Sequence, residues 1–333
     1  MALSGTDAST TIDLARILVG LVALGVASLT DLRTRRVPNV LWYVAAGIGL
    51  GLLVADLALI EGATGWHMLL AFPVAAIFAV TVTGGELWPV MPEAEEDLGR
   101  ELTPSEARIY VLDLVVSGVL VAISIAILVL ASSELGDDGD VLAYIVGSVL
   151  TIAFALMLYM TRVLHGGGDA KALMTLAVIF PIQPLGDTFP MLGVPEAMQL
   201  VFPFALGALI NGAIITALAP LAFIVMSASR RPLRFPEALF GYPVPIDQVE
   251  VGQMWLMFET AEGATEVTRR MWPRRSKEAD EARARALAIL RGRGEERVYV
   301  SPKIPFMVPL LVGLVLAIFL GNILFGLMWA LLG

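Results

Sequence analysis

Long apolar runs recur along this chain from near its N-terminus to its last residue. Crossing a hydrocarbon core ~30 Å thick takes about 20 helical residues, and open sheets cannot cross because their edge groups lack hydrogen-bond partners. Of the 333 residues, 57% are hydrophobic and 16% are charged, which favours lipid as the solvent. The sequence therefore predicts an all-α polytopic membrane protein with about eight transmembrane helices. The expected passages are residues 11–30, 40–60, 66–83, 109–131, 141–163, 170–189, 198–228 and 305–332.

The distribution of basic residues indicates the orientation of these passages. With eight crossings and the N-terminus outside, all 22 lysines and arginines except Arg16 fall on one side, which marks that side as cytoplasmic. The passage at 170–189 is short and contains Pro181 and Pro184, but the basic stretch 229–304 joins the other basic loops only if this passage crosses. We therefore predict a multi-pass protein of the cell (plasma) membrane with its N-terminus outside.

Composition divides the chain into three parts. Residues 1–228 are predicted to form a membrane domain of seven helices with an acidic cytoplasmic loop at 84–108, and residues 305–333 to form the last transmembrane helix. Between them, residues 229–304 are expected to form a small basic cytoplasmic domain with short extended segments and a surface helix in "SKEADEARARALAILRGRG". Its cluster "RRMWPRRSK" is predicted to bind anionic lipid of the bilayer, with substrate binding as the alternative. No nucleic-acid partner is predicted.

Two carboxylates lie at the ends of apolar passages, where charge is costly and often functional. Asp31 ends the first passage in "SLTDLRTRRVPN", and Asp169 follows three glycines in "HGGGDAKAL". An even number of crossings separates them, so both are expected at the cytoplasmic face. The structural alternatives are an N-cap role for Asp169 and an ion pair with a neighbouring arginine for Asp31.

Two carboxylates that meet in a partly dry site share one proton, so one can act as a base and the other as an acid. This arrangement activates water for amide hydrolysis without a metal, a cofactor or a covalent intermediate. Glycines beside Asp169 would let a substrate peptide approach closely. The chain has no cysteine and lacks the HExxH and GxSxG patterns, which disfavours thiolate, zinc and serine hydrolysis.

The stretches "DLRTRRVPN" and "GGGDAK" resemble the archaeal preflagellin and type IV prepilin peptidases, which are membrane aspartic proteases of the GxGD kind. The stretches "SRRP", "FGYPVPIDQV" and "VYVSPKIPFMVPL" also look like the archaeal branch. The resemblance implies that Asp31 and Asp169 are catalytic and that Gly166 and Gly168 are the fixed glycines, with Gly167 between them. It also implies a substrate: archaellin or type IV pilin precursors, cleaved between a short basic leader and a hydrophobic helix at the cytoplasmic membrane face.

Members of that family commonly have six spans, so the passages at 66–83 and 109–131 with the acidic loop are interpreted as an extra hairpin. Asn39 is expected to cap the second passage. Lys171 is expected to anchor the chain at the interface, with an influence on the protonation of the two aspartates as the alternative. The acidic side chains predicted to attract a basic leader are Glu93, Glu95, Glu96 and Asp97.

Two other functions fit the same residues. The aspartates could carry protons or cations in a transporter or channel, although no inverted repeat is visible and both lie at one face. The chain could also be an inactive scaffold of the pilus or archaellum machinery.

Overall fold

A computed structural model describes most of the chain, in two compact units. The first unit comprises residues 1–213 and 305–333, and the second comprises residues 214–304. The described residues are 7–60, 62–84, 103–135, 139–164, 166–185, 191–192, 202–230, 233–249, 254–261, 264, 266–271, 277–302 and 305–332.

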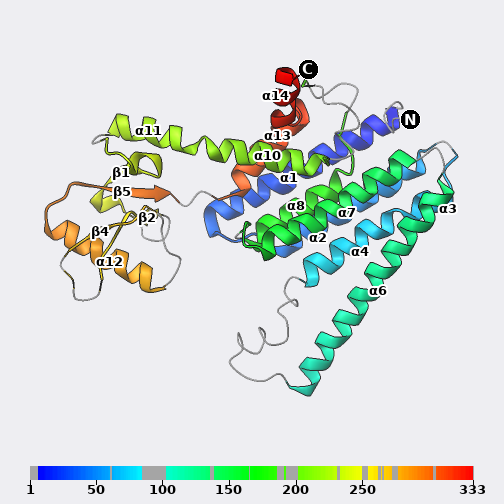
Figure 1. The fold of residues 1–333 in the computed structure, drawn as a ribbon, viewed down its shortest axis with the longest axis horizontal. Coiled ribbons are helices and arrows are strands. Elements are labelled where there is room, and N and C mark those ends of the chain that lie inside the picture. The colour runs from blue at the N-terminus through cyan, green and yellow to red at the C-terminus, as the bar shows by residue number, and fades with distance from the viewer. Residues whose placement is uncertain are drawn as a thin grey trace. The chain divides into compact units, whose positions relative to one another are not determined.

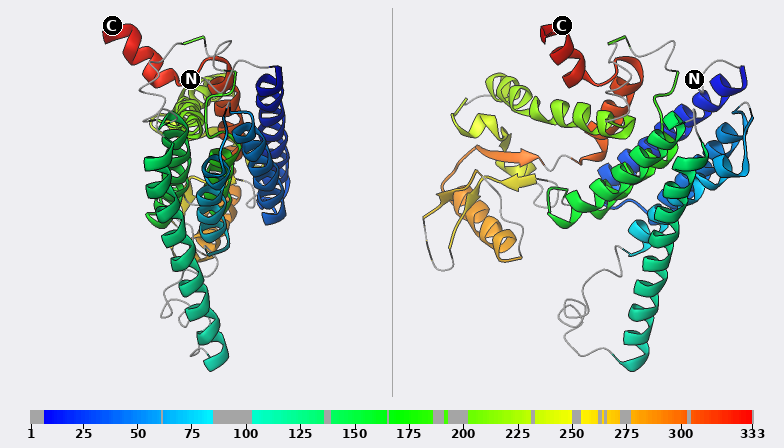
Figure 2. Two further views of the ribbon diagram at one scale, coloured as in Figure 1. Left: turned by 90° about the vertical axis from the view of Figure 1, so that its right-hand side faces the viewer. Right: turned by 45° about the vertical axis from the view of Figure 1, so that its right-hand side comes forward.

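The first unit is a bundle of apolar helices. Figures 1 and 2 show α1, α2, α4, α7 and α8 side by side, and these helices pack on one another. The helices that lie wholly or mainly in this unit are α1 (Asp7–Thr34), α2 (Asn39–Ala58), α3 (Gly65–Leu69), α4 (Ala71–Gly84), α6 (Pro104–Glu134), α7 (Gly139–Met160), α8 (Gly167–Ile179), α10 (Phe204–Ala217), α13 (Met307–Phe319) and α14 (Ile323–Leu332).

Within the described residues, six helices are long and apolar enough to cross a membrane. The bent pair α13 and α14, with 49° between its halves, would make a seventh. The chain is thus a polytopic helical membrane protein, as predicted, but eight crossings are not confirmed. The passage expected at 170–189 is the reason: its helix, α8, has 13 residues, about 20 Å at 1.5 Å per residue, and ends before Pro181. The qualifying helices are Ala8–Thr34, Asn39–Ala58, Gly65–Val82, Val111–Glu134, Gly139–Met160 and Phe204–Arg230.

α8 lies in the interior of the first unit. Its residues are buried on every face from Ala172 to Ile179, so protein surrounds it and it need not match the bilayer thickness. Two glycines allow neighbouring helices to approach its end: a Cβ added at Gly49 of α2 would lie 3.1 Å from the Ile179 Cα, and one added at Gly20 of α1 would lie 2.7 Å from the Phe180 ring. Close packing therefore fixes α1 and α2 against the C-terminal end of α8.

The second unit contains strands, which corrects the all-α prediction. The described residues form a three-stranded antiparallel sheet of order β1-β5-β2, with β1 at Tyr242–Pro245, β5 at Arg297–Pro302 and β2 at Met254–Leu256. Two prolines fit in β1 because it is an edge strand, where a missing N–H costs no ladder bond. A second, two-stranded sheet pairs β3 (Phe258–Glu259) with β4 (Thr268–Arg269).

Helices complete the second unit. α12 (Lys277–Gly292) covers the stretch for which a surface helix is predicted, and its buried Ala286, Leu287 and Leu290 join the hydrophobic core of the sheet. That core includes Val298 and Val300 of β5. The unit also holds α11 (Ala219–Arg230), which continues the apolar span of α10, and two short 3-10 helices, η2 (Glu237–Leu239) and η3 (Ile246–Gln248).

Candidate active site

Asp31 lies in the last turns of α1, with a half-buried side chain. Four residues later, Arg35 has a φ of 57°, and its backbone N–H donates to the Asp31 carbonyl oxygen at 3.0 Å. This left-handed ending stops the helix at Thr34. The Asp31 carboxylate is therefore held near a helix C-terminus, where the helix dipole disfavours negative charge. Helix capping gives no reason for an acid at this position.

Asn39 begins α2 but does not cap it. The N-cap position is occupied by Pro38, which has extended backbone angles (φ −67°, ψ 135°). The prediction that Asn39 is the cap is therefore wrong, because the fixed φ of proline starts the helix one residue earlier. The Asn39 side-chain oxygen instead accepts a hydrogen bond from the Lys171 Nζ at 3.0 Å.

Asp169 is the third residue of α8, whose N-cap is Gly166. Its carboxylate lies against Gly166: a Cβ added at Gly166 would be 2.8 Å from Asp169 Oδ2 and 3.2 Å from Asp169 Cγ. A Cβ at Gly167 would meet the Tyr159 ring at 3.7 Å and one at Gly168 would meet Met307 Cε at 3.5 Å, both ordinary contacts. Among the three glycines, only Gly166 therefore lacks room for a side chain, and the group that occupies that room is the Asp169 carboxylate.

The hydrogen bond between Lys171 and Asn39 joins two parts of the chain that are 132 residues apart. Lys171 lies in the first turns of α8, two residues after Asp169, and Asn39 follows the short connection from α1. The start of α8 and the end of α1 thus lie at the same end of the first unit, and α1 also packs directly on α8. The sequence alone does not predict this pairing, because Lys171 and Asn39 are each a single polar residue beside an apolar passage.

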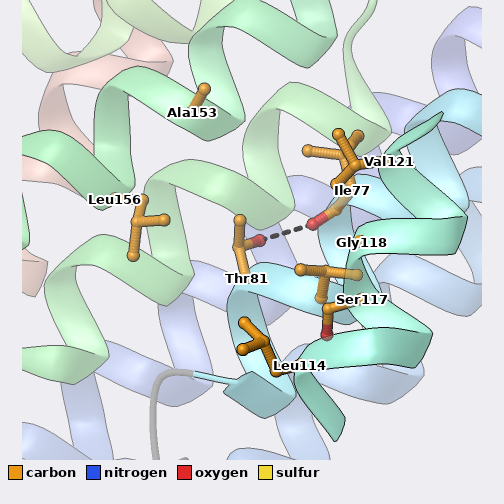
Figure 3. A pocket seen from close by; sticks show the side chains of 9 residues that line it. Ile77, Thr81, Leu114, Ser117, Gly118, Val121, Ala153 and Leu156 are labelled. Carbon is orange, nitrogen blue, oxygen red and sulfur yellow. Dashed lines mark hydrogen bonds between the residues drawn. The ribbon is translucent and has the colours of Figure 1, made fainter. Parts of the chain in front are cut away.

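An apolar cavity of about 380 Å³ lies elsewhere in the first unit, between α4, α6 and α7 (Figure 3). Its lining contains no carboxylate, lysine or histidine. The hydroxyl of Thr81, one of the lining residues, donates to the Ile77 carbonyl oxygen at 2.8 Å, within its own helix. The cavity therefore suits an apolar chain and offers no acid–base groups of its own.

Several features of the sequence lie outside the described residues: the histidine of "HGGGDAKAL" (His165), the acidic loop that includes Glu93, Glu95, Glu96 and Asp97, and most of the cluster "RRMWPRRSK". Where the structure does describe the chain, no group of three or more histidine or acidic side chains is placed to hold a metal ion. His67, at 3% exposure, is buried, and its Nδ1 lies 3.0 Å from the Thr64 hydroxyl and backbone nitrogen, in a helix cap.

The fold is that of a polytopic helical membrane protein, and a comparison with protein families supports a peptidase. Residues 234–323 match the family described as Archaeal Peptidase A24 C-terminus Type II. The match covers 90 of the 333 residues and supports an archaeal prepilin or preflagellin peptidase, the family that the motifs resemble. The matched segment runs from Arg234 in the second unit to Ile323 at the start of α14, so it includes neither aspartate. No curated protein matches the chain.

Proposed function

We propose that the protein is a membrane-embedded aspartic endopeptidase that removes the short basic leader from archaellin or type IV pilin-like precursors at the cytoplasmic membrane face. The observation that carries the proposal is the hydrogen bond between Lys171 and Asn39. It brings the start of α8, with Asp169, to the α1–α2 connection that follows Asp31. No observation of the described residues favours the transporter or the scaffold.

The two helix ends suggest which aspartate does which task. Asp169 is in the first turn of α8, where the helix dipole favours a carboxylate, so it suits the general base that takes a proton from water. Asp31 is near the C-terminal end of α1, where the dipole favours the neutral acid. In this assignment Asp31 donates its proton to the scissile carbonyl oxygen as the water attacks. As the C–N bond of the tetrahedral intermediate breaks, Asp169 passes its proton to the leaving amine and one hydroxyl of the intermediate returns a proton to Asp31.

The proposed substrate fits the expected orientation of the chain. A basic leader stays on the cytoplasmic side because basic residues are retained there, which is also the basis for the expected orientation of this protein. The hydrophobic helix that follows the leader enters the bilayer. The peptide bond between them is then at the membrane surface, at the level expected for both aspartates. The acidic loop with Glu93, Glu95, Glu96 and Asp97 would attract the leader by charge.

The test is leader removal in vesicles. The wild type, Asp31→Asn and Asp169→Asn are reconstituted with a pilin-like precursor, and the product is identified by mass spectrometry. Asp140→Asn is the matched control, since Asp140 is also an acid in the first turn of a helix of the first unit. We expect cleavage by the wild type and the control, and none by the two variants. Cleavage that survives either substitution contradicts the proposal.

A further inference from the structure

Three charged side chains are buried inside the first unit, away from both candidate catalytic residues. Arg16 has no exposed surface, and Asp13 and Asp56 are 4% and 3% exposed. The Arg16 Nη2 lies 2.9 Å from Asp56 Oδ2, and its Nη1 lies 3.6 Å from Asp13 Oδ1. Arg16 is also the one basic residue that the charge segregation between the two membrane sides leaves unexplained.

Asp13 has a second partner that extends this cluster to a third part of the chain. Its Oδ2 accepts a hydrogen bond from the backbone N–H of Leu185 at 2.9 Å. Leu185 lies six residues after the end of α8. The cluster of Asp13, Arg16 and Asp56 thus joins α1, α2 and the segment that follows α8.

The cluster lies at the opposite end of these helices from the candidate active site. Arg16 precedes Asp31 by fifteen residues in α1, which corresponds to about 22 Å along the helix. In α2, Asp56 follows Asn39 by seventeen residues, or about 25 Å. At that distance the cluster cannot exchange a proton directly with Asp31 or Asp169.

The same elements are therefore joined at both ends. At one end Lys171 binds Asn39, at the other the cluster binds Leu185, and between them Gly49 of α2 packs on the backbone of Ile179. Apolar contacts between helices tolerate a small axial shift, whereas the buried ion pair of Arg16 with Asp56 would lose its 2.9 Å contact on such a shift. A buried ion pair is also a poor source of stability, because apolar residues of similar volume often pack as well.

We propose that Asp13, Arg16 and Asp56 are positioning residues that fix the axial register of α1 and α2 against α8. By fixing that register they set the alignment of Asp31 with Asp169. The proposal about the alignment of the aspartates rests on the proposed function, whereas the proposal about the axial register does not.

Spin labels test the register without any assay of activity. The chain has no cysteine, so Leu32→Cys and Val163→Cys introduce two unique labelling sites, which are 53% and 62% exposed. Leu32 reports on the end of α1, and Val163 lies just before α8. Double electron–electron resonance then gives the distribution of distances between the two labels in the full-length protein in vesicles.

Three variants are compared in this labelled background. Asp56→Asn removes one charge from the cluster, and the triple variant Asp13→Leu/Arg16→Met/Asp56→Leu leaves no unpaired charge and tests the idea even if the single variant fails to fold. Asn211→Leu is the matched control: Asn211 is a buried polar residue that bonds Gly321 and Ile323, away from the cluster. We expect a single narrow distribution in the wild type and the control. In the cluster variants we expect a distribution broadened by about 5 Å, the rise of one helical turn.

Two results would overturn the register proposal. A wild-type distribution in the triple variant would mean that the cluster only fills space, and equal broadening in Asn211→Leu would mean that any loss of stability loosens α8. For the alignment, the kcat of leader removal by the triple variant should fall at least about a hundredfold with KM within about twofold, because misplacement of a catalytic group by as little as about 1 Å has that effect. An unchanged kcat with a broadened distribution overturns the alignment. A wild type that cleaves no precursor removes the proposed function and leaves the label measurement to decide the register.

Discussion

The substitution Gly166→Ala isolates the contact between the N-cap of α8 and the Asp169 carboxylate. Gly166 has φ −109° and ψ 125°, an extended conformation that alanine adopts freely, so the substitution brings no backbone strain. The new Cβ would lie 2.8 Å from Asp169 Oδ2, where ordinary contact begins at 3.4 Å, so the carboxylate must move by roughly 0.6 Å. Since misplacement by about 1 Å costs about a hundredfold in rate, we expect kcat to fall at least about tenfold, or about 1.4 kcal/mol of activation free energy.

The assay is the initial rate of leader removal in vesicles at saturating precursor, with the thermal unfolding midpoint measured on the same samples. Gly167→Ala is the matched control, because its Cβ would make only ordinary contact with Tyr159, and it should keep the wild-type kcat. Gly168→Ala also has room in the structure, so a loss of activity there would indicate that the substrate peptide approaches Gly168. Gly166→Ala with kcat within twofold of the wild type would refute the steric reasoning.

Three further experiments test the packing that supports this site. In a double-mutant cycle of Lys171→Met and Asn39→Ala, we expect a coupling of about 1 kcal/mol in the free energy of unfolding, typical of a partly buried hydrogen bond; purely additive effects would contradict it. Gly49→Ala should lower stability by about 1–3 kcal/mol because its Cβ meets the α8 backbone, whereas Gly47→Ala in the same helix has open space and should not. Arg16→Met should destabilise the protein by about 3–5 kcal/mol in denaturant titrations, since it leaves two buried carboxylates without their cation.

The membrane architecture could be predicted because the length and polarity of an apolar run follow directly from bilayer thickness. The same rule failed for the passage at 170–189. α8 is shorter than a bilayer because α1, α2, α4 and α7 surround it, and burial by protein leaves no trace in a hydropathy pattern. In the second unit the sequence indicates extended segments but not the sheet that they form. The pairing is not predictable from local patterns because β1 and β2 each pair with β5, which is distant in the sequence.

Only those residues of the candidate site that belong to a local sequence motif could be predicted from the sequence. Asp31 and Asp169 stand out because each is an acid at the end of an apolar passage, and the even number of predicted crossings between them is the reason to expect both at one face. The role of Gly166 as the contact of the Asp169 carboxylate required coordinates, because the sequence does not distinguish among three consecutive glycines. The bond between Lys171 and Asn39 and the ion pair of Arg16 with Asp56 likewise join residues whose proximity no local pattern encodes.

In the proposed mechanism, Asp31 and Asp169 act as one unit on a single water molecule. The most direct test of this mechanism is the single-turnover rate of leader removal for the wild type, Asp31→Asn, Asp169→Asn and the double variant, all confirmed as folded. Groups that act as a unit are strongly non-additive, so we predict that either single substitution lowers the rate as far as both together. Two partial losses that multiply in the double variant would show that the residues act independently and would contradict a catalytic pair.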